Sequence, residues 1–190
     1  VDENMCIIKT KDILINPENK FLLSSSGKRP KIELAYPEEL FYKQNNFAFY
    51  YDELKKLMED KRYTLLGHSV KSDLYFLNYA CKRYNLPPLN LKAYDTQKMF
   101  QIIYKRPHVE SLSNILKQLE VDTTKLTFHR SCDDAKATFY VAKEICWQEG
   151  IELDELLKER TDCLSWLDQK ENDKQKSHKT KHSFTKNHQR

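Results

Sequence analysis

Short apolar runs alternate along the chain with longer segments whose apolar residues recur at helical spacing. Residues 63–66 form a brief β-prone run that predicts a buried strand. A second short run, at residues 91–94, predicts another strand. Between them lies a predicted helix that a double proline ends. This alternation favours an α/β fold. The apolar positions of the predicted helix are Leu74, Phe76, Leu77, Ala80 and Cys81.

Amphipathic patterns predict the remaining elements. In the predicted helix at residues 47–58 the buried face is expected to consist of Phe49, Leu54, Leu57 and Met58. Residues 21–30 are polar and turn-rich towards their end, which predicts an exposed loop. The other predicted elements are strands at residues 5–8 and 13–15, a short helix near residue 37, and helices at residues 97–104, 111–119, 135–148 and 152–167.

The composition limits the classes of protein to which the chain can belong. With 190 residues, 39% of them hydrophobic, the chain suits one domain with its own core. Three glycines argue against a glycine-rich phosphate loop, and five scattered cysteines without a Cys-x-x-Cys pair argue against a zinc site or a disulfide framework. There is no apolar run of membrane-spanning length and no signal-peptide pattern, so we expect a cytoplasmic protein with no membrane partner.

Charge divides the chain into two parts. Residues 169–190 contain seven Lys or Arg and two acidic residues, whereas the rest of the chain is close to neutral. We therefore predict one domain at residues 1–168 and a basic, disordered tail at residues 169–190. Such a tail would attract nucleic acid without reading its sequence, because its positive charges attract phosphates.

Two segments place a histidine five residues before an aspartate at the start of a helix. His68 precedes Asp73, which lies in the first turn of the helix that follows the connection at residues 67–72, at the end of a strand where α/β folds place their sites. His129 precedes Asp134 in the same way. A single first-turn aspartate is usually no more than a helix cap. Two such segments together predict a site assembled from separate helices around metal ions.

The order and spacing of these segments resemble the DEDDh 3′–5′ exonucleases, which include the proofreading subunits and domains of bacterial replicative polymerases. The second motif of that family reads His-Asn-Ala-x-Phe-Asp-x-x-Phe-Leu, and the stretch from His68 to Leu77 is similar to it apart from three positions. The third motif reads His-x-x-x-x-Asp-Ala, which His129 to Ala135 match. The intervening family elements resemble Asp95-Thr96 and Ser111-Leu112.

The resemblance implies a ribonuclease-H-like fold, with a mixed sheet flanked by helices, and a site for two Mg²⁺ or Mn²⁺ ions. Asp73 and Asp134 would serve the ions, because hard cations prefer oxygen ligands. His129 would be the general base, and His68 would brace the loop. Asp133 would face away, since one residue along a helix turns a side chain by about 100°. The implied reaction is hydrolysis of phosphodiester bonds at the single-stranded 3′ end of DNA or RNA, with a DNA polymerase as a candidate partner.

The family's first motif, an Asp-x-Glu on the first strand, is missing from this sequence. Asp2 and Glu3 do not replace it, because adjacent residues on a strand point to opposite faces. Either the chain is cropped after that strand or it is a shortened, non-catalytic relative. We expect the intact gene product to be a metal-dependent exonuclease, and the chain as it stands to have little or no activity. The alternative is a catalytically dead exonuclease fold that binds nucleic acid or a polymerase partner.

Overall fold

The structure is built on a small mixed β-sheet. A computed structural model describes residues 1–21 and 34–166. The strand β1 (Leu65–Gly67) runs parallel to β2 (Lys92–Asp95), and β3 (Leu164–Trp166) runs antiparallel to β2 on its other side. The helix between β1 and β2 makes this pair an α/β unit, so the predicted α/β class and mixed sheet are confirmed. The sheet is compatible with a ribonuclease-H-like fold, which stays a prediction.

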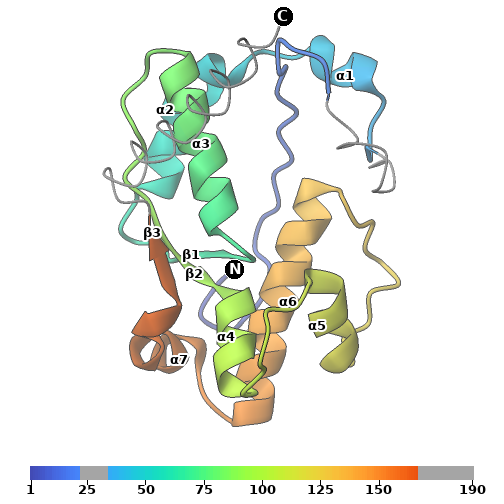
Figure 1. Cartoon of the computed structure of the whole chain (residues 1–190), viewed down its shortest axis with the longest axis vertical. Helices are drawn as coiled ribbons and strands as arrows, with labels where there is room; N and C mark the ends of the chain where they lie inside the picture. The colour runs from blue at the N-terminus through green and yellow to red at the C-terminus, as the bar shows by residue number, and fades with distance from the viewer. Residues whose placement is uncertain (22–33, 167–190) are drawn as a thin grey trace, which may run out of the picture.

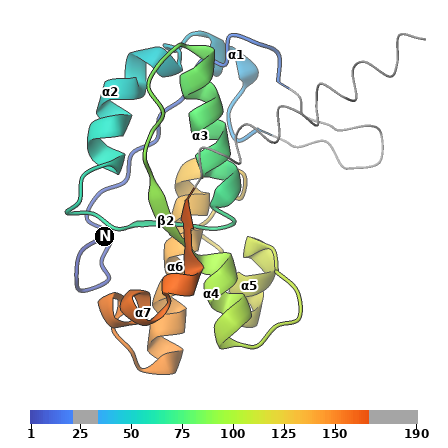
Figure 2. The ribbon, with the colours of Figure 1, turned by 60° about the vertical axis from the view of Figure 1, so that its left-hand side comes forward.

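The helices divide into two groups. Figure 1 shows α1, α2 and α3 at one end of the molecule and α4, α5 and α7 at the other, while α6 runs past the sheet towards the second end. The same division is visible after the rotation in Figure 2. The helices are α1 (Glu38–Tyr42), α2 (Phe47–Met58), α3 (Lys71–Arg83), α4 (Thr96–Ile103), α5 (Leu112–Gln118), α6 (Ser131–Glu149), α7 (Leu153–Glu159) and the 3-10 helix η1 (Thr161–Cys163).

Each group of helices encloses a core of its own. The larger core joins α4, α5, α6 and α7, and it contains Phe100, Ile115 and Ile145, each at most 1% exposed. The second core joins α2 and α3 and contains Tyr51 and Leu74. Burying a large apolar side chain stabilises the fold by about 1.5–3 kcal/mol. The two cores therefore fix the positions from which α3, α5 and α6 reach the end of the sheet.

Two helices bury only part of the face predicted for them, since Leu54 and Met58 on α2 and four of the five predicted residues on α3 do pack in the second core. The helix α2 begins and ends at the predicted residues, but Phe49 and Leu57 are 68% and 52% exposed, whereas Phe47 and Tyr51 are buried. On α3, Phe76 is 66% exposed. These helices carry apolar residues on more than one side, and spacing alone does not tell which side meets the core.

The predicted strands at residues 5–8 and 13–15 are wrong. Residues 5–8 and 13–15 form no strand. Beside them, Asn16 makes one isolated parallel β-bridge with Asn46. Met5 and Ile15 instead pack against the two cores through their side chains. An apolar run explains that packing, but a strand also needs a neighbouring backbone to accept and donate its hydrogen bonds.

The helix predicted at residues 152–167 ends much earlier. After α7 and η1 the chain straightens into β3, because the free edge of β2 offers backbone hydrogen bonds that override the local helical spacing. Residue 167, the predicted tail and nearly all of the loop predicted at residues 21–30 lie outside the described residues. Within the two described ranges, no helix has the length and apolar character needed to cross a membrane.

The end of α6 gives a test of this local geometry. Gly150 has a φ of 64°, and a Cβ there would meet no atom within 4 Å. Only the backbone conformation therefore opposes a side chain. We expect Gly150→Ala to lower the free energy of unfolding by about 1–2 kcal/mol in urea denaturation. Gly150→Asn should lose less, since asparagine adopts this conformation more readily. Equal losses would contradict the explanation.

Candidate active site

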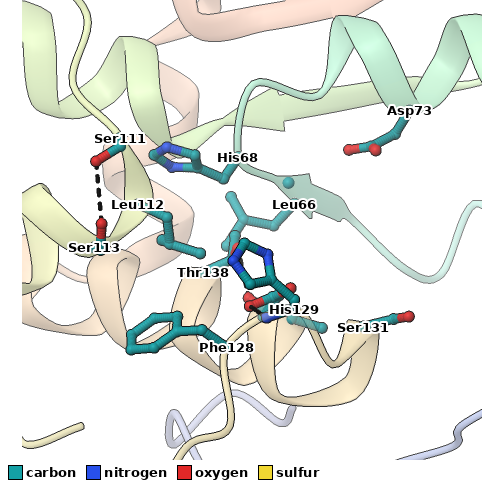
Figure 3. Close-up of a pocket in the computed structure, with 13 residues that line it drawn as sticks. Leu66, His68, Asp73, Ser111, Leu112, Ser113, Phe128, His129, Ser131 and Thr138 are labelled. Carbon is teal, nitrogen blue, oxygen red and sulfur yellow. Dashed lines mark hydrogen bonds between the residues drawn. The ribbon is translucent and has the colours of Figure 1, made fainter. Parts of the chain in front are cut away.

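A cavity of about 860 Å³ opens where β1 ends and where α3, α5 and α6 begin. Asp73, His129 and Asp134, the three predicted site residues, all line it. Figure 3 shows Asp73 on one side of this space, with His129 between it and the apolar side chains Leu112 and Phe128. The cavity thus joins the two sequence segments that carry the predicted chemistry.

Asp73 lies in the first turn of α3, as predicted. The turn before the helix is tight: a Cβ on Gly67 would lie 2.7 Å from Val70 Cγ2, and Ser69 has a left-handed φ of 55°. Desolvation by the surrounding protein atoms and the negative charge of Asp95 raise the pKa of the Asp73 carboxyl group. An ionised Asp73 would therefore gain from a cation placed beside it.

Asp95 holds this turn from the neighbouring strand. Its side chain, in a residue only 3% exposed, accepts hydrogen bonds from the backbone N–H groups of Ser69 at 2.8 Å and Val70 at 3.2 Å. It also accepts one from the N–H of Gln97 at 3.0 Å, which caps α4. One carboxylate at the end of β2 therefore orders both the turn that leads to Asp73 and the next helix.

His129 and Asp134 meet at the start of α6. The backbone N–H of His129 donates to Asp134 Oδ1 at 3.3 Å. Burial raises the pKa of Asp134, and this donated bond and the charge of His129 oppose the rise. His129 itself is exposed and has a left-handed φ of 66°. This conformation costs a non-glycine residue about 1–2 kcal/mol, and the residue lies just before α6, where it lines the cavity.

The neighbouring aspartate has a different role. Asp133 is buried and does not line the cavity. It accepts from Lys136 Nζ at 2.9 Å and from the Thr127 N–H at 3.3 Å, and Lys136 is the main reason why its pKa is lowered. Asp133 therefore secures the start of α6, and Asp134 is the residue of the pair that reaches the cavity.

His68 lines the cavity but points away from Asp73, towards Ser111, as Figure 3 shows. Its Nδ1 lies 3.1 Å from Thr96 Oγ1, and the Thr96 hydroxyl donates to the Gly67 carbonyl at 3.1 Å. Burial lowers the pKa of His68, against the opposing effect of Asp95. A neutral ring tied to Thr96 suits the bracing role that the resemblance implies for this histidine.

Among the other lining residues, Ser111 and Leu112 belong to a pair that the family resemblance marks, whereas Leu66, Phe128 and Thr138 are marked by no motif. Leu66, Leu112 and Phe128 form an apolar wall, and Thr138 on α6 completes the lining. Ser111 could be anticipated, because it precedes an apolar helix, and its hydroxyl does accept from the Asn114 N–H at 3.3 Å. Asp2, by contrast, lies in an N-terminal turn where it accepts from the N–H groups of Asn4 and Cys6.

The cavity suits a divalent cation in chemistry but not in number of ligands. Asp73 and Asp134 offer the carboxylate oxygens that Mg²⁺ and Mn²⁺ prefer. Within residues 1–21 and 34–166, however, no three or more His, Cys, Asp or Glu side chains are grouped closely enough to hold a metal ion. The described residues therefore do not form the two-ion centre that the resemblance implies.

Comparison with known proteins assigns the chain to a family. Residues 20–145 match the model of the family described as DNA polymerase III subunit epsilon-like, C-terminal domain (DEDDh_C). The chain belongs to this family. The matched range of the epsilon-like domain includes Asp73, His129 and Asp134, and it confirms the suspected relationship to the DEDDh exonucleases. No curated protein and no solved structure matches the chain significantly.

Proposed function

We propose that the cavity is a metal-dependent 3′–5′ exonuclease site acting on the 3′ end of DNA or RNA. One observation carries the proposal: Asp73 on α3 lines the same cavity as His129 and Asp134, which lie before and within the first turn of α6, far away in the sequence. Membership of the epsilon-like family supports it. The pKa values of the Asp73 and Asp134 carboxyl groups are raised, and such carboxylates are suited to binding a cation. The exposed His129 beside them is suited to moving a proton.

Each residue has a role in this proposal. His129 takes the proton from the water that attacks the phosphodiester, since imidazole can accept a proton near neutral pH. Asp73 and Asp134 would hold the cation, and its remaining ligands would have to come from groups other than the described side chains. When bound, the cation neutralises negative charge on the reacting phosphate. Leu112 and Phe128 form an apolar surface beside His129 that suits the base of the terminal nucleotide.

A second function is favoured by the small number of ligands. With two carboxylates on the cavity and no group of three metal-binding side chains in the described ranges, the domain would bind nucleic acid or a polymerase without cleaving. The two functions differ in one respect that can be measured. The exonuclease needs divalent cations bound by Asp73 and Asp134, whereas the binding module does not.

The test uses the protein at its natural length, with Mn²⁺ binding measured by calorimetry and cleavage measured on a 3′-labelled single strand. Asp134→Asn is expected to weaken Mn²⁺ binding at least about tenfold and to stop cleavage. Asp122→Asn is the matched control, because Asp122 is exposed and does not line the cavity. Salt-dependent binding of the strand without cleavage by the wild-type protein would establish the second function instead.

The raised pKa of Asp73 predicts that removing its negative charge stabilises the folded protein. The folded carboxyl group holds its proton more tightly than the unfolded one, whose ordinary pKa is 3.8, so its ionisation destabilises the fold. In metal-free buffer at pH 7, Asp73→Asn should therefore stabilise the protein, by roughly 0.5–1 kcal/mol after screening by solvent. The gain should shrink as pH falls and vanish below the unfolded pKa. Denaturation series at several pH values measure it, and a loss of stability at pH 7 would contradict it.

A further inference from the structure

One side of α3 carries a row of aromatic side chains that the proposed reaction does not use. Tyr75 and Tyr79 are four residues apart, so they lie on one face of the helix. Their rings are 6.4 Å apart between centroids and inclined by only 23°, and the Phe76 ring lies edge-on to Tyr75 at 6.0 Å. Phe76 and Tyr79 are 66% and 59% exposed. Large apolar rings exposed together on one helix mark a binding surface more often than a chance arrangement.

The opposite side of α3 accounts for the helix's own packing. Leu74, Asn78 and Cys81 are buried against the second core and the chain after α3. The aromatic face is therefore not needed to hold α3 in the fold. Its rings can be removed one at a time with little loss of stability, which makes the surface accessible to experiment.

The charges on this helix favour a polyanion. Along α3 the sequence supplies Lys71 in the first turn and Lys82 and Arg83 in the last, and its single acidic residue is Asp73. Arg83 donates to the carbonyls of Pro17 and Glu18 and is ion-paired with the Glu18 carboxylate at 3.8 Å, so its charge is largely used within the fold. Lys82 is exposed, so positive charge stands at the far end of the aromatic row.

The aromatic row is also continuous with the cavity. Phe76 is one turn along the helix from Asp73, which lines the proposed site, and Tyr79 lies about one further turn away. We propose that Tyr75, Phe76 and Tyr79 form a stacking platform for the bases of a single strand of nucleic acid whose end enters the cavity. The proposal goes beyond the proposed function but rests on it for the identity of the ligand. Stacking is tolerant of sequence, because every base presents a π-face.

The test separates base stacking from phosphate binding. Fluorescence anisotropy measures binding of the full chain to a short labelled oligothymidylate and to an abasic strand of the same length, in EDTA to prevent cleavage. Tyr79→Ala and Phe76→Ala are each expected to weaken binding of the oligothymidylate about tenfold and to leave the abasic strand unaffected. Because every variant keeps the basic residues at 169–190, their contribution cancels from the comparison.

Two control variants sharpen this test. Tyr79→Phe keeps a stacking ring and should bind as the wild type does. Phe49→Ala removes a ring that is 68% exposed on α2, and it should change neither affinity. Unchanged affinity in Tyr79→Ala and Phe76→Ala, or equal losses on both strands, would overturn the proposal. The proposal would also be overturned if Phe76→Ala abolished self-association of the chain and left the affinity for the oligothymidylate unchanged. The rings would then bind a second copy of the chain.

Failure of this proposal can be told from failure of the exonuclease proposal. If binding depends on the rings but no cleavage occurs at any divalent cation concentration, the stacking platform is supported and the exonuclease proposal is rejected. If the ring variants cleave and bind the oligothymidylate as the wild type does, only the stacking-platform proposal is rejected. Asp73→Asn gives the matching internal comparison, since it should stop cleavage while preserving the ring-dependent binding measured in EDTA.

Discussion

Replacing His129 by alanine is expected to reduce the cleavage rate by about 10²–10⁴-fold, with a much smaller change in KM. The proposed general base is then lost, and general-base catalysis contributes a factor of that size. His129 is exposed and packs little, so substrate binding through other residues should persist. Single-turnover cleavage of a 3′-labelled strand by the natural-length protein measures the effect. If His129→Ala instead raised KM by a factor similar to the one by which it lowered kcat, His129 would be a binding residue.

The backbone of His129 requires a matched variant. At a φ of 66° an alanine is strained, so His129→Ala changes both the chemistry and the start of α6. His129→Asn tolerates this conformation and still lacks a base, and it should be as inactive as the alanine variant. Added imidazole should restore part of the activity in both, because the cavity is open to small solutes. His108→Ala, which changes an exposed histidine away from the cavity lining, should leave the rate unchanged.

The sequence could predict much of the site because its signals are local. A strand followed by a first-turn aspartate places Asp73 at the end of β1, and the register of α6 separates Asp134 from Asp133 within one turn. Asp133 is committed to Lys136 and Thr127, as an aspartate on another side of the helix must be. The functions of these residues stay proposals. Leu112 belongs to the Ser111-Leu112 pair that the sequence marks, but its position beside Phe128 could not be predicted, because it depends on how α5 and α6 approach each other.

The errors in the fold have the same cause. The predictions failed where a segment depended on a distant partner: β3 exists because β2 has a free edge, and residues 5–15 lack the neighbour that a strand requires. The prediction that Phe49 and Phe76 are buried is wrong for a related reason, since helical spacing identifies apolar positions but does not show which of them face the core. Periodicity thus predicts an element, whereas its partner decides the element's type and its buried face.

Asp95 is expected to have the largest effect on stability of any polar residue at the site. Asp95→Ala would leave the buried N–H group of Val70 and the part-buried N–H groups of Ser69 and Gln97 without their acceptor. Hydrogen bonds to a charged group each contribute about 1.5–3 kcal/mol, and unsatisfied donors add to the loss. We expect the free energy of unfolding to fall by about 3–5 kcal/mol in urea denaturation, with the turn that leads to Asp73 loosened even in the folded fraction.

The isosteric variant separates the hydrogen bonds from the charge. Asp95→Asn can keep its oxygen towards Ser69 and Gln97, which both donate to Oδ1, and loses only the bond to Val70. It should therefore lose clearly less stability than Asp95→Ala. It also removes the negative charge that raises the pKa of Asp73, so a carboxyl titration followed by NMR should find the Asp73 pKa lowered. Equal losses in both variants, or an unchanged Asp73 titration, would mean that Asp95 does not couple the end of β2 to the site. If both effects appear, the residue that orders the turn also sets how strongly Asp73 attracts a cation.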